Sequence, residues 1–272
     1  PVLGSVALGA MMVGTGIKLV YDTGLPLVLI GVVGILAVMG LWFRDVISES
    51  RGGLYDEQMD RSFRWGMGWF IFSEVMFFAA FFGALFYVRM FAIPWLGGEG
   101  AKGVSALLWP DFVATWPLLN PPDTSIAGPE QVFSPWQLPL VNTLILITSS
   151  ITLTVAHEAL KVGDRKTCRN WLTGTVLLGC CFIMIQGIEY YEAYAHYGIT
   201  LEAGIFGATF FILTGFHGVH VIIGTLILAA MLVRIIKGHF GDENHFGFEA
   251  SCWYWHFVDV VWVGLFIFVY VL

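Results

Sequence analysis

An acidic side chain lies near the middle of a long apolar segment. Glu74 is flanked on both sides by aromatic and aliphatic side chains within residues 65–87, a run long enough to cross a bilayer. A carboxylate at membrane depth costs about 3 kcal/mol or more, so such a group is usually protonated, paired or turned towards the protein interior. We therefore expect Glu74 to be neutral and hydrogen-bonded to a buried partner.

Imidazoles occur in two further apolar segments. His217 and His220 lie three residues apart in segment 203–236, and His256 and Asp259 have the same spacing in segment 247–272. Residues at this spacing share one face of a helix. Histidine inside a membrane helix is a common ligand of haem or copper. Haem-binding bundles, however, usually place their histidines well apart along a helix, and this sequence has no such pair.

The same residues fit two other interpretations. In the first, the carboxyl and imidazole groups form a buried polar network and satisfy one another, with His217 or His220 as the partner of Glu74. In the second, Glu74, the two histidines and Asp259 relay protons across the membrane. A relay needs polar groups at several depths, whereas the segment around Glu74 is nearly all aromatic. The residues favour the network but leave all three possibilities open.

Composition places these residues in an all-α membrane protein. The 272 residues are 57% hydrophobic and 12% charged, which is typical of a polytopic membrane protein. The formal net charge is −7, and nothing indicates nucleic-acid binding. We predict one membrane domain over residues 1–272, with seven transmembrane helices near 2–20, 25–47, 65–91, 137–160, 169–194, 203–236 and 247–272.

Basic residues are concentrated on alternate loops and helix ends. The connections after the second, fourth and sixth segments hold Arg44, Arg51, Arg61, Arg64, Lys161, Arg165, Lys166, Arg169, Arg234 and Lys237. The opposite side has only Lys18, Arg89 and Lys102. The positive-inside rule then places the N-terminus inside and the C-terminus outside. Because the first residue is Pro1 and not Met, we expect that a preceding piece has been removed or left out.

The connection over residues 92–136 is predicted to be an outer loop. It is rich in proline and also contains four tryptophans, which suit a membrane interface or a protein contact. Glu189 and Glu192, near the outer end of the fifth segment, are expected at the interface and hydrogen-bonded to neighbours or water.

The inner ends of two segments combine tryptophan with charged groups. Trp42, Arg44 and Glu49 close the second segment, and Arg234 and Lys237 close the sixth. Such residues could hold a phospholipid head group, or the basic side chains could simply extend to the interface.

The sequence resembles subunit III of the aa-type cytochrome c oxidases of bacteria and mitochondria, in order and along nearly the whole chain. The matching motifs are Trp42-Phe-Arg44-Asp45-Val-Ile, Ser73-Glu74-Val-Met-Phe-Phe, Leu138-Pro-Leu-Val-Asn142-Thr, Gly163-Asp164-Arg165-Lys166, Thr214-Gly-Phe-His217-Gly-Val-His220-Val, Phe246-Gly-Phe-Glu249-Ala and Trp253-Tyr-Trp-His256-Phe-Val-Asp259-Val-Val-Trp262. Phe43, Glu158 and Asn244 depart from residues that the family often has.

The resemblance implies a seven-helix fold in which the first two helices form a V-shaped cleft against the other five. It implies that phospholipid binds in this cleft, with lipid-contact positions matching Trp42, Arg44, Glu49, Arg234 and Lys237. The acid matching Glu74 is the family's carbodiimide-reactive carboxyl. This chain is expected to carry no catalytic residue, haem, copper or other metal, since haem a and copper belong to partner subunits. The polar network is therefore preferred over metal ligation.

The implied role is supportive. The subunit is expected to pack on subunit I, to share a complex with subunit II, to sustain proton uptake and to protect the active site from inactivation during turnover. The complex reduces oxygen with electrons from cytochrome c and pumps protons across a bacterial inner membrane or the mitochondrial inner membrane. The alternatives are subunit III of a quinol oxidase, which typically lacks the two segments before Glu74, a haem-binding membrane cytochrome, and a transporter.

Overall fold

The computed structural model describes residues 2–240 and 245–272, so Asn244 lies outside the described residues. This part of the chain is all-helical and contains no strand. Seven of its helices are long and apolar enough to cross a membrane, which confirms the predicted fold class. The chain divides into two compact units, Pro1–Phe63 and Arg64–Leu272, and the division falls within one helix.

The first unit contains a helical hairpin of α1 (Val2–Tyr21) and α2 (Leu25–Arg51). The turn between them uses Gly24, whose φ of 94° is a conformation that side chains other than glycine's rarely adopt. Gly31 allows the helices to approach closely, because a Cβ atom there would lie 2.5 Å from the backbone nitrogen of Met11. Most of the apolar side chains of the hairpin are exposed, as expected of helices that face lipid or another protein.

The third helix, α3 (Glu57–Tyr87), begins eight residues before the predicted start at 65. Asp56 caps it, since its Oδ1 accepts the backbone N–H of Met59 at 2.7 Å. Glu57 and Asp60 in the first turn also favour helix at this end. The prediction began late because a search for apolar length disregards a polar first turn.

Helical structure also continues beyond residue 91, into the segment predicted to be loop. A π-helical turn (η1, Val88–Ala92) leads directly into a short helix, α4 (Ile93–Leu96). Pro94, the second residue of α4, has no N–H to donate to the preceding π-helical turn, so one backbone hydrogen bond is missing at this point of the continuous helix. The rest of the connection to residue 137 is irregular apart from one 3₁₀ segment, η2 (Gly103–Leu108). Arg89 contributes to its attachment, because its guanidinium lies 5.3 Å from the centre of the Trp116 ring.

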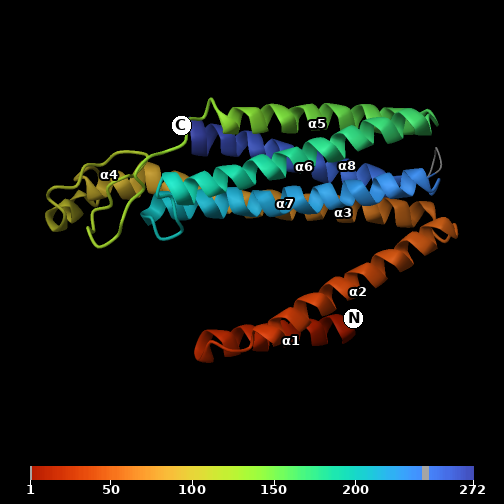
Figure 1. Ribbon diagram of the computed structural model, residues 1–272, viewed down its shortest axis with the longest axis horizontal. Coiled ribbons are helices and arrows are strands. Elements are labelled where there is room, and N and C mark those ends of the chain that lie inside the picture. Colours follow the sequence, from red (N-terminus) through yellow and green to blue (C-terminus); the bar gives the residue numbers. More distant parts are fainter. Residues whose placement is uncertain (1, 241–244) are drawn as a thin grey trace. The chain divides into compact units, whose positions relative to one another are not determined.

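The second unit is a bundle in which α5 (Leu138–Lys161), α6 (Arg165–His196), α7 (Gly204–Ile236) and α8 (Phe246–Leu265) lie side by side with α3, as Figure 1 shows. A π-helical segment, η3 (Phe266–Val271), extends α8. α3 contacts α7 and α8 through aromatic side chains: Phe77 packs on Phe216 and Phe78 packs on Phe257.

Buried residues on α6 recur at alternating spacings of four and three. They are Cys168, Leu172, Thr175, Gly179, Phe182, Gln186, Glu189 and Ala193. This repeat of 3.5 residues keeps one face of the helix against its neighbours along its whole length. Hydroxyl groups complete the packing: Ser149 accepts a hydrogen bond from the Trp255 indole, and Thr143 accepts one from Trp262, each at 3.0 Å. These bonds fix α8, which carries His256 and Asp259, against α5.

The predicted single domain and V-shaped cleft concern how the two units are arranged, and they stay predictions.

Candidate functional site

Glu74 of α3 and His220 of α7 form a side-chain pair inside the bundle. Glu74 Oε2 lies 3.0 Å from His220 Nε2, although the residues are 146 positions apart in the sequence. The side chain of Glu74 is 22% exposed and that of His220 is 12% exposed. The expected buried partner of Glu74 is thus an imidazole, and of the two candidates it is His220.

The second ring nitrogen of His220 constrains the protons in this pair. Nδ1 lies 2.7 Å from the carbonyl oxygen of Phe216, which can only accept a hydrogen bond, so Nδ1 carries a proton. A neutral His220 then has Nε2 as an acceptor and requires a protonated Glu74. A charged His220 donates through Nε2 and requires an ionised Glu74. In either form the pair has no net charge and one proton lies between its two members.

Aromatic rings surround the pair. Phe78 lies 5.1 Å from the His220 ring between centroids, and Tyr254 stacks on that ring at 6.3 Å. Phe77 and Phe257 also contact it. The contacting groups are largely apolar, so they provide little polar solvation for a separated charge. An uncharged pair is therefore favoured over either group ionised alone.

His217 has a different environment, although it lies only one turn from His220. Its ring is fully buried and its Nε2 lies 3.1 Å from the carbonyl oxygen of Val258 on α8. Phe182 and Trp262 pack against the ring. Three residues along a helix correspond to a rotation of about 60° between side chains, so His217 is directed to α6 and α8 while His220 is directed to α3. The two histidines do not form one joint site.

His256 and Asp259 lie where α8 packs on α5. His256 Nδ1 is 2.6 Å from the Ser150 hydroxyl; Ser150 is buried and His256 is partly buried. Asp259 Oδ1 is buried and has no hydrogen-bond partner among the described residues. The five residues predicted to form one polar network therefore belong to three local groups, of which only Glu74 and His220 pair directly.

The first-unit residues that were predicted to close the second segment at the inner side are largely at the surface. Trp42 is 66% exposed and stacks on Phe43. Arg44 forms an exposed ion pair with Asp45 at 3.1 Å. Glu49 accepts a hydrogen bond from the Tyr55 hydroxyl at 3.1 Å, and partial burial together with this carboxylate raises the pKa of Tyr55 above its usual value of 10.0. Trp42 and Arg44 are thus available to a ligand from the membrane interface.

In the second unit, Arg234 and Lys237 lie at the end of α7. The Arg234 guanidinium is 4.1 Å from the centre of the Phe240 ring, and Lys237 follows the last helical residue. Figure 1 shows the end of α7 at the same end of this unit as the α5–α6 turn. Arg64 of α3 lies in this unit too and forms an ion pair with Glu249 of α8 at 2.7 Å, which sequence reasoning did not identify.

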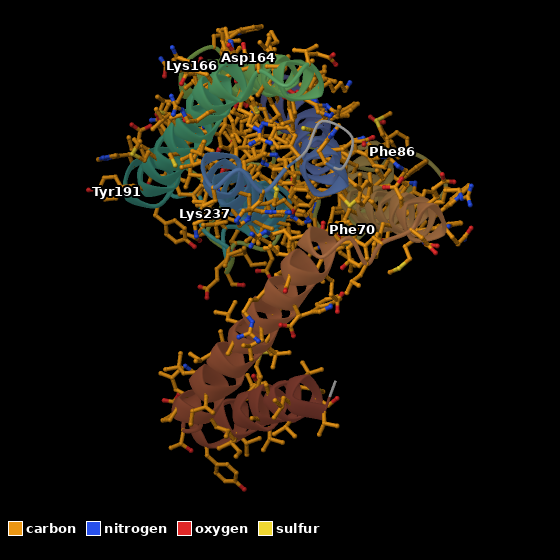
Figure 2. All side chains as sticks on the ribbon, turned by 90° about the vertical axis from the view of Figure 1, so that its right-hand side faces the viewer. Phe70, Phe86, Asp164, Lys166, Tyr191 and Lys237 are labelled. Atoms are coloured by element: carbon orange, nitrogen blue, oxygen red, sulfur yellow. The ribbon has the colours of Figure 1, made fainter. Side chains whose placement is uncertain are left out.

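The burial of Glu189 inside the protein was not predicted from the sequence. Glu189 is fully buried, whereas Glu192 is partly exposed, and the depth of both in the membrane stays a prediction. Figure 2 shows Tyr191, two residues later, at the outer edge of the bundle. The spacing of four and three residues along α6 was the available signal, since it places Gln186 and Glu189 on the same face as Phe182 and Gly179.

No three His, Cys, Asp or Glu side chains within residues 2–240 and 245–272 are arranged to hold a metal ion. The four cysteines have no disulfide partner, and Cys168 and Cys252 are buried. His217 and His220 each place a ring nitrogen against a backbone carbonyl, which for His217 lies on α8 and for His220 on the preceding turn of α7.

Comparison with known proteins gives one consistent result. A family model described as cytochrome c oxidase subunit III matches residues 1–272. The chain is 40% identical over 271 residues to cytochrome c oxidase subunit 3 of Gadus morhua, and 39% identical over 271 residues to that of Oncorhynchus masou. It is 40% identical over 272 residues to the subunit of Tetraodon nigroviridis. Each alignment covers 99% of this chain and 92% of the relative.

Proposed function

Since this chain belongs to the cytochrome c oxidase subunit III family, we propose that it supports the catalytic subunit of the oxidase and carries no redox centre of its own. It is a core subunit of a respiratory terminal oxidase and a component of that oxidoreductase complex. The match along the whole chain carries this proposal. Haem a and copper would then reside in the partner subunits, and cytochrome c would deliver electrons to the complex.

The proposed partners are subunits I and II, with subunit I in direct contact. Large apolar side chains on one helix of the second unit support such a contact, because Val219, Ile222, Ile223 and Leu226 of α7 are exposed. Inside a membrane these side chains face lipid or another subunit. The chain's contribution to oxygen reduction is accordingly to stabilise its neighbour and to sustain proton uptake into it.

The Glu74–His220 pair fits this supportive role. It holds one proton between two side chains and has no net charge, and aromatic rings surround it. We propose that the pair fixes α3 against α7 and that protons enter the oxidase through the neighbouring subunit.

We also propose that phospholipid head groups bind at the inner helix ends, through Trp42, Arg44 and Glu49 in the first unit and through Arg234 and Lys237 in the second. The exposure of Trp42 and Arg44 supports this, because an indole and a guanidinium at an interface can hold a phosphate group. Trp42→Ala combined with Arg234→Ala is expected to release lipid from the purified oxidase and to shorten its lifetime during turnover.

A matched control removes a tryptophan and a basic residue from the other side of the membrane, as Trp136→Ala combined with Lys18→Ala. Unchanged lipid content and lifetime in the first pair of substitutions, or an equal loss in the control, would contradict the lipid assignment.

The membrane is proposed to be a bacterial plasma membrane or the mitochondrial inner membrane, with the N-terminus inside. The concentration of basic residues at alternate helix ends supports this orientation. Protease accessibility of tags at the two ends, in sealed vesicles of known sidedness, tests it.

The supportive role is tested by purifying the oxidase with and without this chain. Without it, the haem spectrum and the initial rate of oxygen reduction are expected to persist, while proton uptake slows and activity is lost sooner during turnover. Adding the chain back should restore both. Loss of haem or copper on removal of this chain, or an unchanged lifetime, would refute the proposed role.

A further inference from the structure

A second buried acid lies in the bundle, apart from the Glu74–His220 pair. Glu189 of α6 is 0% exposed, and Gln186 lies one turn before it on the same face. Asn142 of α5 joins this group, since its amide nitrogen donates to Gln186 Oε1 at 3.4 Å. The hydroxyl of Tyr270 in η3 lies close to both Gln186 and Glu189, but it forms no hydrogen bond of acceptable length and angle with either side chain. All four side chains are at least nine-tenths buried.

Five polar atoms of this group are buried and have no hydrogen-bond partner within 3.5 Å among the described residues. They are Asn142 Oδ1, Gln186 Nε2, both carboxylate oxygens of Glu189 and the Tyr270 hydroxyl. Buried polar atoms in native proteins are nearly always satisfied by protein or by ordered water. Five such atoms in one group of four side chains from three elements therefore indicate a site that holds a small polar ligand.

The charged surroundings decide between possible ligands. The other titratable groups around Glu189 are Tyr270 of η3, with Glu192 and Tyr190 of α6 itself, and none of these is a cation. The α5 side contributes the Asn142 amide, while α7 and α8 contribute the aromatic rings of Phe210 and Trp262 against Tyr270. An ionised carboxylate without a counter-charge is strongly disfavoured in such a place.

The donors in the group also disfavour a metal cation. Gln186 Nε2 and the Tyr270 hydroxyl are hydrogen-bond donors, whereas a hard cation requires a shell of oxygen acceptors. A protonated Glu189 adds a third donor and leaves its carbonyl oxygen as an acceptor beside Asn142 Oδ1. Water, with two donor hydrogens and two acceptor positions, matches a mixture of this kind, and buried waters typically form about three hydrogen bonds.

We propose that Glu189, Gln186, Asn142 and Tyr270 form a hydrated proton-binding site, in which Glu189 is a neutral carboxylic acid hydrogen-bonded to ordered water. The site lies near one end of the bundle. Glu189 is seven residues from the last residue of α6, or about 10 Å along the helix axis. Asn142 is four residues from the start of α5 at the same end. The carboxylic acid proton of Glu189 exchanges with the solvent at this end of the bundle.

The test is infrared spectroscopy of the intact oxidase containing Glu189→Gln, in H₂O and in D₂O. The difference from wild type is expected to show the loss of one carboxylic acid C=O band, and this band should shift on transfer of the wild type to D₂O. Glu192→Gln, one turn away at a partly exposed acid, is the matched control and should leave the band in place. Tyr270→Phe should retain the band but move it, because one hydrogen bond to the site is lost.

Two results would overturn the proposal. The first is spectroscopic: Glu189→Gln removes carboxylate bands and no carboxylic acid band, or the carboxylic acid band of the wild type does not shift in D₂O. The other comes from a map of the wild-type complex at a resolution that shows ordered water, which needs no variant to fold. Density within hydrogen-bond distance of Gln186 Nε2 and Asn142 Oδ1 is expected, and its absence, or binding of added Na⁺ or K⁺ there, would count against the site.

Discussion

Replacing Glu74 by glutamine distinguishes between the two possible proton arrangements of the Glu74–His220 pair. The His220 Nδ1 proton is engaged by the Phe216 carbonyl oxygen at 2.7 Å, so a neutral His220 accepts at Nε2. A glutamine amide can donate to that nitrogen as a protonated Glu74 would. If the resting pair is neutral, Glu74→Gln therefore keeps the hydrogen bond and is expected to destabilise the chain by no more than about 1 kcal/mol.

Glu74→Ala provides the scale for this comparison. It removes the only side-chain partner that the structure gives His220 Nε2 within the described residues, and it leaves space between α3 and α7. An unsatisfied buried acceptor together with lost packing corresponds to about 2–3 kcal/mol, reduced somewhat because the Glu74 side chain is 22% exposed. If the resting pair is instead ionised, glutamine leaves a cation unpaired, and its effect should approach about 3 kcal/mol as well.

The assay is the denaturant midpoint at which the chain unfolds within the purified oxidase, measured for wild type, Glu74→Gln and Glu74→Ala. Glu192→Gln serves as a control for replacing a partly exposed carboxyl elsewhere in the bundle. The neutral-pair account predicts that the glutamine variant lies close to wild type and to this control. A glutamine variant as unstable as the alanine variant would refute it.

Two further predictions concern the scaffold that positions these residues. Gly224→Ala should destabilise the bundle by about 1–3 kcal/mol, because the new Cβ would lie 2.8 Å from the fully buried ring of Trp255. Gly218→Ala on the same helix is the control: its Cβ meets nothing within 4 Å, so it should be neutral or slightly stabilising. The unfolding midpoints of the two variants provide the comparison. Asp164 caps α6 by accepting the Thr167 N–H at 3.0 Å, and hydrogen bonding by Thr167, through its side chain first and its backbone N–H second, lowers the pKa of the Asp164 carboxyl below the usual value of 3.8. The stabilisation of the helix end by the ionised Asp164 carboxylate is therefore fully present above pH 3.8 and is lost as the pH falls through the lowered pKa. In wild type, protection of the first-turn amides of α6, relative to their intrinsic exchange rates, should fall over this pH range. In Asp164→Asn the protection should not depend on pH over the same range.

The number and the approximate places of the membrane helices followed from the sequence because apolar length is a local property. Where the boundaries differ, local polar chemistry is the cause. α3 starts at Glu57 because Asp56 caps a polar first turn, and helical structure reaches Leu96 through a π-helical turn that leads into the short helix containing Pro94. A window that counts apolar residues registers neither effect.

The pairing of side chains did not follow from the sequence in the same way. The sequence identified Glu74, His217 and His220 as buried polar groups, but which imidazole meets Glu74 depends on the rotation of α7 and on its placement beside α3. That placement is determined by packing between residues more than a hundred positions apart, such as Phe77 against Phe216. A shared helix face was too coarse a criterion, because about 60° separates residues three apart.

The burial of Glu189 shows what the position of a residue along a segment leaves open. Its place near the end of the segment indicated its depth in the membrane, whereas the repeat of 3.5 residues along α6 indicated that it is buried in the protein. The repeat determined the outcome, because Glu189 continues the same buried face as Cys168, Leu172 and Phe182. In a bundle of this kind, helix face is a better guide to burial than distance from the membrane surface.

The central claim is that this chain is a subunit of an oxidase whose redox centres lie in its partners. An optical spectrum and a metal analysis of the chain, purified alone and then with its native partners, test this claim most directly. A colourless, metal-free chain that copurifies with a haem–copper core is the predicted result. Stoichiometric haem or copper in the isolated chain would contradict it and would make His217, His220 or His256 the ligands.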